Sequence, residues 1–132
     1  MRQQYHSRAV GEDIYVWDVH RLVALAEEHP VVLIPLSSLA ELDENWWYSD
    51  PSNTPTPRSI ASHMGLVNET NLDYPIILCA EGRLMDGMHR AVKAILEGEE
   101  NIKAVRFQET PSPDHINVSL DDLPYDDMEN SS

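Results

Sequence analysis

The sequence predicts a small α/β (α+β) domain in which a mixed sheet packs against helices. Two observations predict this class: apolar residues recur at helical spacing in three segments, and short β-branched apolar runs lie between them. With 132 residues and 42% hydrophobic content, the chain can build one core but not two. We therefore expect one domain over residues 1–120 and an acidic, flexible tail over residues 121–132.

The first predicted helix covers Asp18 to Glu28, with Asp18 as its N-cap and the proline after His29 as its end. Its apolar residues follow the i, i+3, i+4, i+7 pattern of one helical face and are Val19, Leu22, Val23 and Ala26. The run Val31 to Ile34 that follows is short and continuously apolar. It predicts a strand that is buried on both faces near the centre of the sheet.

A loop and a second helix are expected next. Between Glu41 and Pro57 helical periodicity is lost, and proline, serine and threonine gather as they do in surface loops. Thr56 is the expected N-cap of a helix that begins at Pro57 and runs to about Val67. Its predicted inner face consists of Ile60, Ala61, Met64 and Val67.

Two adjacent tryptophans, Trp46 and Trp47, stand at the start of this loop. We interpret one of the two as an aromatic core plug that closes the end of the sheet, because a buried indole contributes a large apolar area. Stacking on the base of a ligand is the alternative.

A hairpin and a third helix follow in the sequence. The segments Pro75–Ala80 and Arg83–Met85 read as two strands joined at Gly82, which can take the positive φ of a tight turn. A helix is predicted from Met88 to a stop at Gly98. Its apolar face is expected to hold Met88, Ala91, Val92, Ile95 and Leu96.

The last predicted elements complete the sheet. Asn101 to Phe107 is β-rich and should return beside the earlier strand, so that strand, helix and strand form a crossover unit. Beyond Pro111 we expect at most a short edge strand at Ile116–Val118 and a frayed end from Tyr125.

The charge limits the partners. The net charge is −14, from 23 acidic and 9 basic side chains, and no basic patch is visible in the sequence. Such a chain repels nucleic acid at long range. Much of the acid lies between Asp121 and Glu129, so the body of the domain remains able to bind a small phosphorylated ligand.

Cysteine usage and the N-terminus indicate a cytoplasmic protein. Cys79 is the single cysteine, so it cannot form an internal disulfide, and we expect it to be a buried small hydrophobe rather than a nucleophile. The polar start Met1–His6 is not followed by the apolar segment of a signal peptide. No apolar run is long enough to span a bilayer.

The start of the third helix carries the strongest functional signal. A helix N-terminus presents free N–H groups and a partial positive charge, so the basic residues His89 and Arg90 are unfavourable there unless an anion joins them. Gly87 lets the backbone approach such an anion, and the amides of Met88 and His89 would point at it. The motif predicts a phosphate site. The alternative is structural: Asp86 caps the helix and Arg90 pairs with a nearby carboxylate.

The segment Ile76–Ala94, with its hairpin and Asp-Gly-Met-His-Arg turn, resembles the ParB/sulfiredoxin superfamily, and a looser similarity extends from Val31 to Phe107. The resemblance implies that Gly87, Met88, His89 and Arg90 hold the phosphates of a nucleotide. Met88 stands where sulfiredoxins carry their nucleophilic cysteine, so sulfiredoxin chemistry is not expected. The acidic end of the chain is also unlike the DNA-binding segments that follow this domain in ParB proteins.

The turn is most similar to that of ADP-dependent free serine kinases, which implies a catalytic role for Asp86, with ATP or ADP and Mg²⁺ as cofactors. Those kinases use a second acidic residue after the first strand. Glu41, Asp43 and Glu44 compete for that place here, and the metal ligands stay unassigned. Arg58 and His63 are expected on a solvated helix face, with a contact to the phosphates as the alternative.

The sequence thus predicts a nucleotide-binding domain that transfers a phosphoryl group, with Mg²⁺, to a small hydroxyl compound. The first alternative is a non-catalytic module that senses a nucleotide or binds a protein. A metal-dependent nuclease is the third hypothesis, and the charge argues against it.

Overall fold

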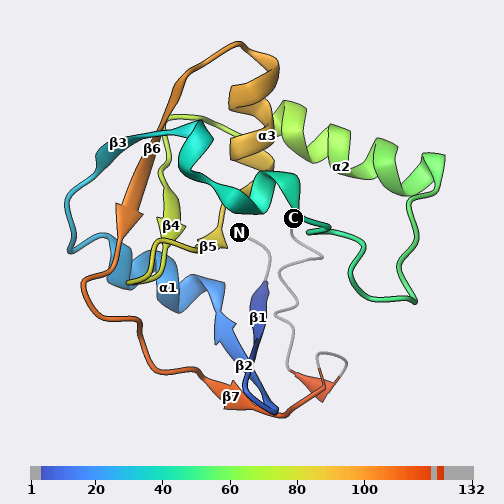
Figure 1. The fold of residues 1–132 in the computed structure, drawn as a ribbon, viewed down its shortest axis with the longest axis vertical. Coiled ribbons are helices and arrows are strands. Elements are labelled where there is room, and N and C mark those ends of the chain that lie inside the picture. The colour runs from blue at the N-terminus through green and yellow to red at the C-terminus, as the bar shows by residue number, and fades with distance from the viewer. Residues whose placement is uncertain (1–3, 120–121, 124–132) are drawn as a thin grey trace.

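The part of the chain that the structure describes folds into two small sheets and three α-helices, which agrees with the predicted α+β class (Figure 1). The structure is a computed structural model that describes residues 4–119 and 122–123, so most of the predicted acidic tail lies outside the described residues. In chain order the strands and helices are β1 (Tyr5–Val10), β2 (Asp13–Asp18), α1 (Val19–Ala26), β3 (Val32–Pro35), α2 (Pro57–Glu69), β4 (Ile76–Leu78), β5 (Leu84–Asp86), α3 (Met88–Leu96), β6 (Asn101–Arg106) and β7 (His115–Ile116). Two short 3₁₀ helices, Leu36–Ser38 and Ala40–Asp43, follow β3.

The larger sheet has the strand order β3-β6-β4-β5 and is mixed. β4 and β5 form the predicted antiparallel hairpin, with Gly82 at a φ of +86° in the turn. β6 returns after α3 and runs parallel to β4, which confirms the crossover unit. β3 is antiparallel to β6. The smaller sheet has the order β1-β2-β7, and β7 is the short edge strand that the sequence predicts near Ile116.

Two clusters of buried side chains form the core on the two faces of the larger sheet. Ile76 and Leu78 belong to the cluster under α3, whereas Ile77 and Cys79 belong to the cluster under α1. Successive strand residues point to opposite faces, so this alternation places one cluster on each side of β4. β4 is therefore the strand that is buried on both faces, and the predicted burial of Cys79 is confirmed.

The predicted position of the strand near Val31 is wrong. β3 lies at one edge of the larger sheet, and Val32 and Leu33 are 45% and 68% exposed. The short apolar run correctly indicates a strand, but a run of this length does not reveal which neighbours the strand will find. The centre of the sheet is formed by β6 and β4 instead.

The predicted helix caps are confirmed. The Asp18 carboxylate accepts a hydrogen bond from the His20 amide at 2.9 Å, and the Thr56 hydroxyl accepts one from the Ser59 amide at 3.1 Å. α2 begins at Pro57 as predicted and continues two residues beyond Val67.

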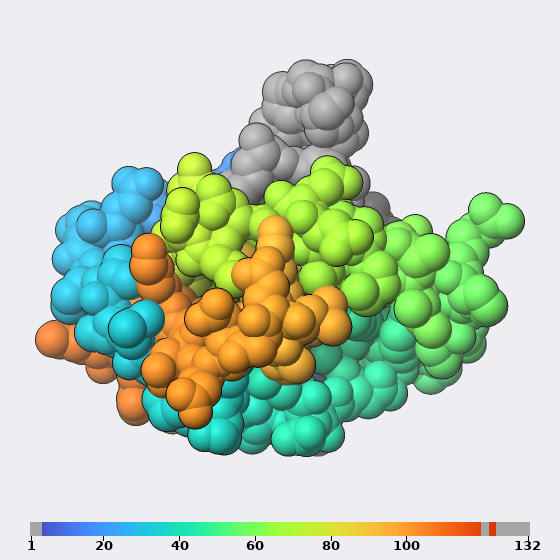
Figure 2. Space-filling view, turned by 90° about the horizontal axis from the view of Figure 1, so that it is seen from above, coloured from blue at the N-terminus to red at the C-terminus, as the bar shows by residue number. Residues whose placement is uncertain are grey.

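The predicted inner faces of α2 and α3 are only partly correct. In α2, Val67 is buried, but Ile60 and Ala61 are exposed, because the C-terminal part of α2 contacts α3 while its N-terminal end projects away from the rest of the domain (Figure 1). In α3 the buried residues are Met88, Ala91 and Ala94. Ile95 and Leu96 lie in the last turn and are exposed. Figure 2 shows the end of α3 and the turn after it, in orange, at the surface beside α2.

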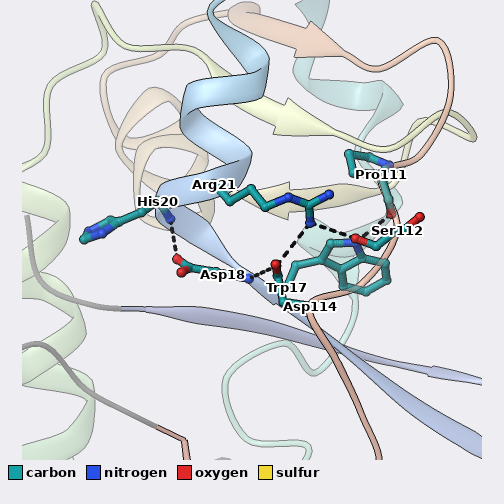
Figure 3. A network of polar contacts seen from close by, with 7 residues as sticks. All are labelled: Trp17, Asp18, His20, Arg21, Pro111, Ser112 and Asp114. Atoms are coloured by element: carbon teal, nitrogen blue, oxygen red, sulfur yellow. Dashed lines mark hydrogen bonds and ion pairs between the residues drawn. The ribbon is translucent and has the colours of Figure 1, made fainter.

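The strands β1 and β2 form a hairpin that the sequence did not predict, with Gly11 at a φ of +62° in its turn. A network of polar contacts fastens the chain after β6 to this hairpin and to the start of α1 (Figure 3). The Trp17 indole donates to the Pro111 carbonyl at 2.8 Å, and the Asp18 amide donates to the Asp114 carboxylate at 2.8 Å. Arg21 pairs with the same carboxylate at 3.2 Å. The two sheets are thereby joined through segments far apart in the sequence.

None of the helices in the described part of the chain has the length and apolar character that a bilayer crossing requires.

Candidate functional site

The turn between β5 and α3 can be made only by glycine. Gly87 is the N-cap of α3 and has a φ of +112°. A Cβ atom at this position would lie 2.6 Å from Cγ2 of Ile76, closer than two carbon atoms can approach. Among the residues that the structure describes, no side chain caps the first amides of α3, and the N-cap is Gly87, so the structural prediction that Asp86 is the N-cap is wrong. The amides of the first helical turn keep their capacity to bind an acceptor.

Asp86 and Arg90 lie on the same side of the turn and form an ion pair. Arg90 Nη2 is 2.9 Å from Asp86 Oδ2 and also donates to the Pro75 carbonyl at 3.2 Å. The side chains are only 17% and 18% exposed, which strengthens their attraction relative to a surface pair. Arg90 Nε is buried and has no hydrogen-bond partner within the described part of the chain, so these contacts do not fully satisfy the guanidinium. The prediction that Arg90 reaches a nearby carboxylate is confirmed.

A cleft of about 530 Å³ opens beside this ion pair, between α1 and the segment that leads into β4. Asp86 and Arg90 form its charged end, and Glu27 adds a further carboxylate to its wall. Most of its other walls are apolar and include Val23, Ala26, Val31, Tyr74, Pro75 and Val105. A volume of this size with a few polar groups at one end is typical of sites for small organic ligands. No sequence motif predicts this cleft, because its walls come from residues that are distant from one another in the chain.

His89 does not line this cleft but belongs to an aromatic cluster on another side of α3. Its Nε2 lies 3.0 Å from Nδ1 of His63, and the ring of Trp47 stacks over both imidazoles, with centroid distances of 4.0 Å to His63 and 5.1 Å to His89. Burial lowers the pKa of His89, and the nearby His63 and Arg90 add to this effect. Burial also lowers the pKa of His63. Two neutral imidazoles, one donating to the other, fit this geometry.

The structure thus separates residues that the sequence placed in one cradle. Asp86, Gly87 and Arg90 meet at or beside the cleft, whereas His89 faces α2 and the Trp47 loop. Trp46 and Trp47 both pack against the core cluster under α3, as the aromatic-plug interpretation expects. Arg58 is exposed on α2.

The three acidic residues after β3 have different surroundings. Glu41 is 2% exposed, accepts a hydrogen bond from the Leu84 amide at 3.0 Å and lies 3.4 Å from Arg83 Nε. Glu44 is exposed and pairs with Nη2 of Arg83 at 3.0 Å. Asp43 is exposed. Glu41 is therefore held at the start of β5, while Asp86 ends the same strand.

These carboxylates do not form a ready metal centre. Asp86 is engaged by Arg90, and Glu41 by Leu84 and Arg83. Within residues 4–119 and 122–123, no group of three or more His, Cys, Asp or Glu side chains could hold a metal ion. The described residues therefore do not fit a preformed Mg²⁺ site.

No family model, curated protein or solved structure matches the chain. The resemblance of Ile76–Ala94 to the ParB/sulfiredoxin superfamily stays a prediction.

Proposed function

We propose that the chain binds a nucleotide of the ADP or ATP type in the cleft beside α3, with the phosphates directed toward Arg90 and the first amides of the helix. The observation that carries the proposal is the Asp86–Arg90 pair at the charged end of an otherwise mostly apolar cleft of about 530 Å³. A nucleotide has the matching chemistry, because one end is a flat base and the other is a strong oxyanion.

Three features of the site support an oxyanion at its charged end. The first turn of α3 has no side-chain cap, and a helix N-terminus favours negative charge. Arg90 Nε has no partner, and a guanidinium fork matches a phosphate in geometry. Gly87 leaves the backbone of the turn without a side chain. At the apolar end, the exposed ring of Tyr74 is available to stack on a base.

A phosphate that binds Arg90 competes with Asp86 for the guanidinium. The carboxylate released in this way would lie next to the phosphate and could accept the proton of a hydroxyl compound. In that reaction the hydroxyl oxygen bonds to the terminal phosphorus, the bond from this phosphorus to the nucleotide breaks, and the proton moves to Asp86. We include this phosphotransfer as the catalytic form of the proposal. The resemblance to serine kinases implies Mg²⁺ for this reaction, although the described carboxylates form no preformed site for the ion.

A second candidate is a module that binds a protein without catalysis. The edge strand β3 favours it, because Val32 and Leu33 are exposed and one side of the strand is unpaired by any strand of the described chain. An exposed apolar edge of this kind can add a strand from a partner.

Calorimetric titration of ADP, ATP and CTP, with and without Mg²⁺, tests the binding proposal. We expect saturable binding to the wild type, loss of most affinity in Arg90→Ala, and unchanged affinity in Arg58→Ala, which removes an equal charge from the exposed face of α2. The proposal is wrong if the wild type binds none of the three nucleotides.

The Asp86→Asn variant separates catalysis from binding. A phosphotransferase loses turnover in this variant and keeps its affinity for the nucleotide, whereas a binding module has no turnover even as wild type. Metal-dependent cleavage of nucleic acid that free ADP does not inhibit would instead indicate the nuclease hypothesis.

A further inference from the structure

A second cavity, of about 380 Å³, lies between β1, the loop that carries Trp46, and the start of β5. It shares no lining residue with the cleft beside α3. Arg8 and Arg83 both line it, and the hydroxyl-bearing residues Ser7 and Ser49 contribute to its polar walls. In a chain with only 9 lysines and arginines and a net charge of −14, two guanidinium groups at one cavity form an unusual local surface.

The backbone of Leu84 brings the two arginines together. Nη2 of Arg8 lies 3.5 Å from the Leu84 carbonyl oxygen. On the amide side of the same residue, Glu41 Oε2 accepts the Leu84 N–H and lies 3.4 Å from Nε of Arg83. The two guanidinium groups are thus on either side of one residue of β5.

The two arginines differ in how their charge is balanced. Arg83 contacts two carboxylates, those of Glu41 and Glu44. Arg8 forms no ion pair with any residue that the structure describes. Its guanidinium carbon lies 5.6 Å from the centroid of the Trp17 ring, and its contact with Leu84 is long for a hydrogen bond. Arg8 therefore supplies a positive charge to the cavity that the described side chains do not neutralise.

His6 adds a polar atom without a partner. Its ring is stacked between Trp17, at 5.7 Å, and Trp46, at 6.0 Å, and its Nε2 is buried without a hydrogen bond. Burial, and then the charge of Arg8, lowers the pKa of His6 to about 4, so the imidazole is neutral at pH 7 and can donate or accept one hydrogen bond. His6 and Arg8 are two residues apart on β1 and lie on the same face of the strand.

We propose that this cavity binds a small ligand through an oxyanion, a phosphate or carboxylate group, with Arg8 as its main partner and His6 beside it. The planar fork of a guanidinium matches both anions in a two-point contact. The site is separate from the proposed nucleotide site and does not depend on it.

The test uses Arg90→Ala, so that an anion bound at the α3 cleft does not contribute. Inorganic phosphate and succinate are titrated separately while the three indole N–H signals are followed by NMR. The Trp46→Phe variant identifies the signal of Trp46, which lines the cavity. We expect a saturable shift of this signal. Saturation by phosphate alone, by succinate alone or by both supports the site and identifies which anion it takes.

Arg8→Gln in the same background keeps the side-chain stem and removes the charge, and should weaken the anion about tenfold. Arg8→Lys keeps the charge but not the planar guanidinium fork and should weaken anion binding less. This variant replaces Arg8→Gln if the glutamine variant does not fold. Arg58→Gln, on exposed α2, should leave the affinity unchanged. The proposal is overturned if neither anion shifts the Trp46 signal saturably, or if the Arg8 variants bind as tightly as the background.

Discussion

Gly87 shows most clearly how one residue determines the geometry of the site. It joins β5 to α3 at a left-handed φ and lies against Ile76, so both its conformation and the lack of a side chain are required. The sequence indicates a glycine for close approach of an anion. The structure adds a second reason, which is packing against β4, and this reason cannot be inferred from the motif alone.

Gly87→Ala should destabilise the fold by about 2 to 4 kcal/mol, because it combines a strained φ with an overlap in the core. Urea unfolding measures the change. Gly65→Ala is the matched control: Gly65 lies inside α2 with open space around it, so alanine should stabilise the fold by about 1 kcal/mol. Equal effects of the two substitutions would contradict the described turn.

Glu41 should matter far more for stability than Glu44. Glu41→Ala leaves the buried Leu84 amide without an acceptor, which should cost about 1 to 3 kcal/mol. Glu44→Ala breaks an exposed ion pair and should cost about 0 to 1 kcal/mol. Chemical unfolding of both variants checks the order, and a larger loss for Glu44→Ala would show that Glu41 is not the residue that holds β5.

The stability of the fold should fall as the pH drops from 6.5 toward 4. The pKa of His6 is lowered from 6.5 to about 4 in the folded chain, so the unfolded chain binds the proton first within this window. Above pH 6.5 the neutral imidazole makes its full contribution to the stability of the fold. His6 alone should account for a loss of about 2 kcal/mol between pH 7 and pH 5. Urea unfolding at the two pH values should show a smaller loss for His6→Gln; an unchanged loss would contradict the buried, neutral histidine.

At the scale of elements, helix boundaries were predictable and strand positions were not. Asp18, Thr56 and Pro57 mark helix starts through local hydrogen bonding and a fixed φ, so their signals act within a few residues. Whether a strand is central or at an edge depends on pairing with distant segments. The run near Val31 therefore predicted a strand and misplaced it in the sheet.

Alanine substitutions in β4 and β3 test this assignment. Ile76→Ala removes a fully buried side chain from β4 and should cost about 2 to 5 kcal/mol. Leu33→Ala acts on the exposed edge strand β3 and should change the stability by less than about 0.5 kcal/mol. Thermal or urea unfolding compares them. If the Leu33 variant were the less stable of the two, β3 would have to be a central strand after all.

The β1–β2 hairpin shows why a whole element escaped prediction. β1 has the sequence Tyr-His-Ser-Arg-Ala-Val, with few apolar residues and no strict alternation, and Val10 at its end is exposed. Its position depends on contacts with segments far along the chain, such as the one between Arg8 and Leu84. The second cavity, which this strand lines, therefore could not be predicted from the sequence.

For the whole molecule, the α+β class and the charged residues of the candidate site could be predicted from the sequence. Neighbours in the sequence, such as Asp86 and Arg90, were found together because a strand-to-helix turn keeps them together. The apolar walls of the cleft could not be predicted, because α1, Tyr74 and β6 meet only in the folded chain. The position of His89 could not be predicted for the same reason. The motif predicted that His89 contacts the phosphate, whereas in the fold its side chain contacts His63.

The central claim is that the cleft beside α3 binds a nucleotide. An NMR titration of ADP into the ¹⁵N-labelled wild type, with backbone amides assigned, tests it most directly. We predict saturable shifts that concentrate on the amides of residues 87–90 and on the cleft wall at Val23 and Ala26 of α1. The absence of saturable shifts, or shifts confined to residues outside the cleft, would contradict it.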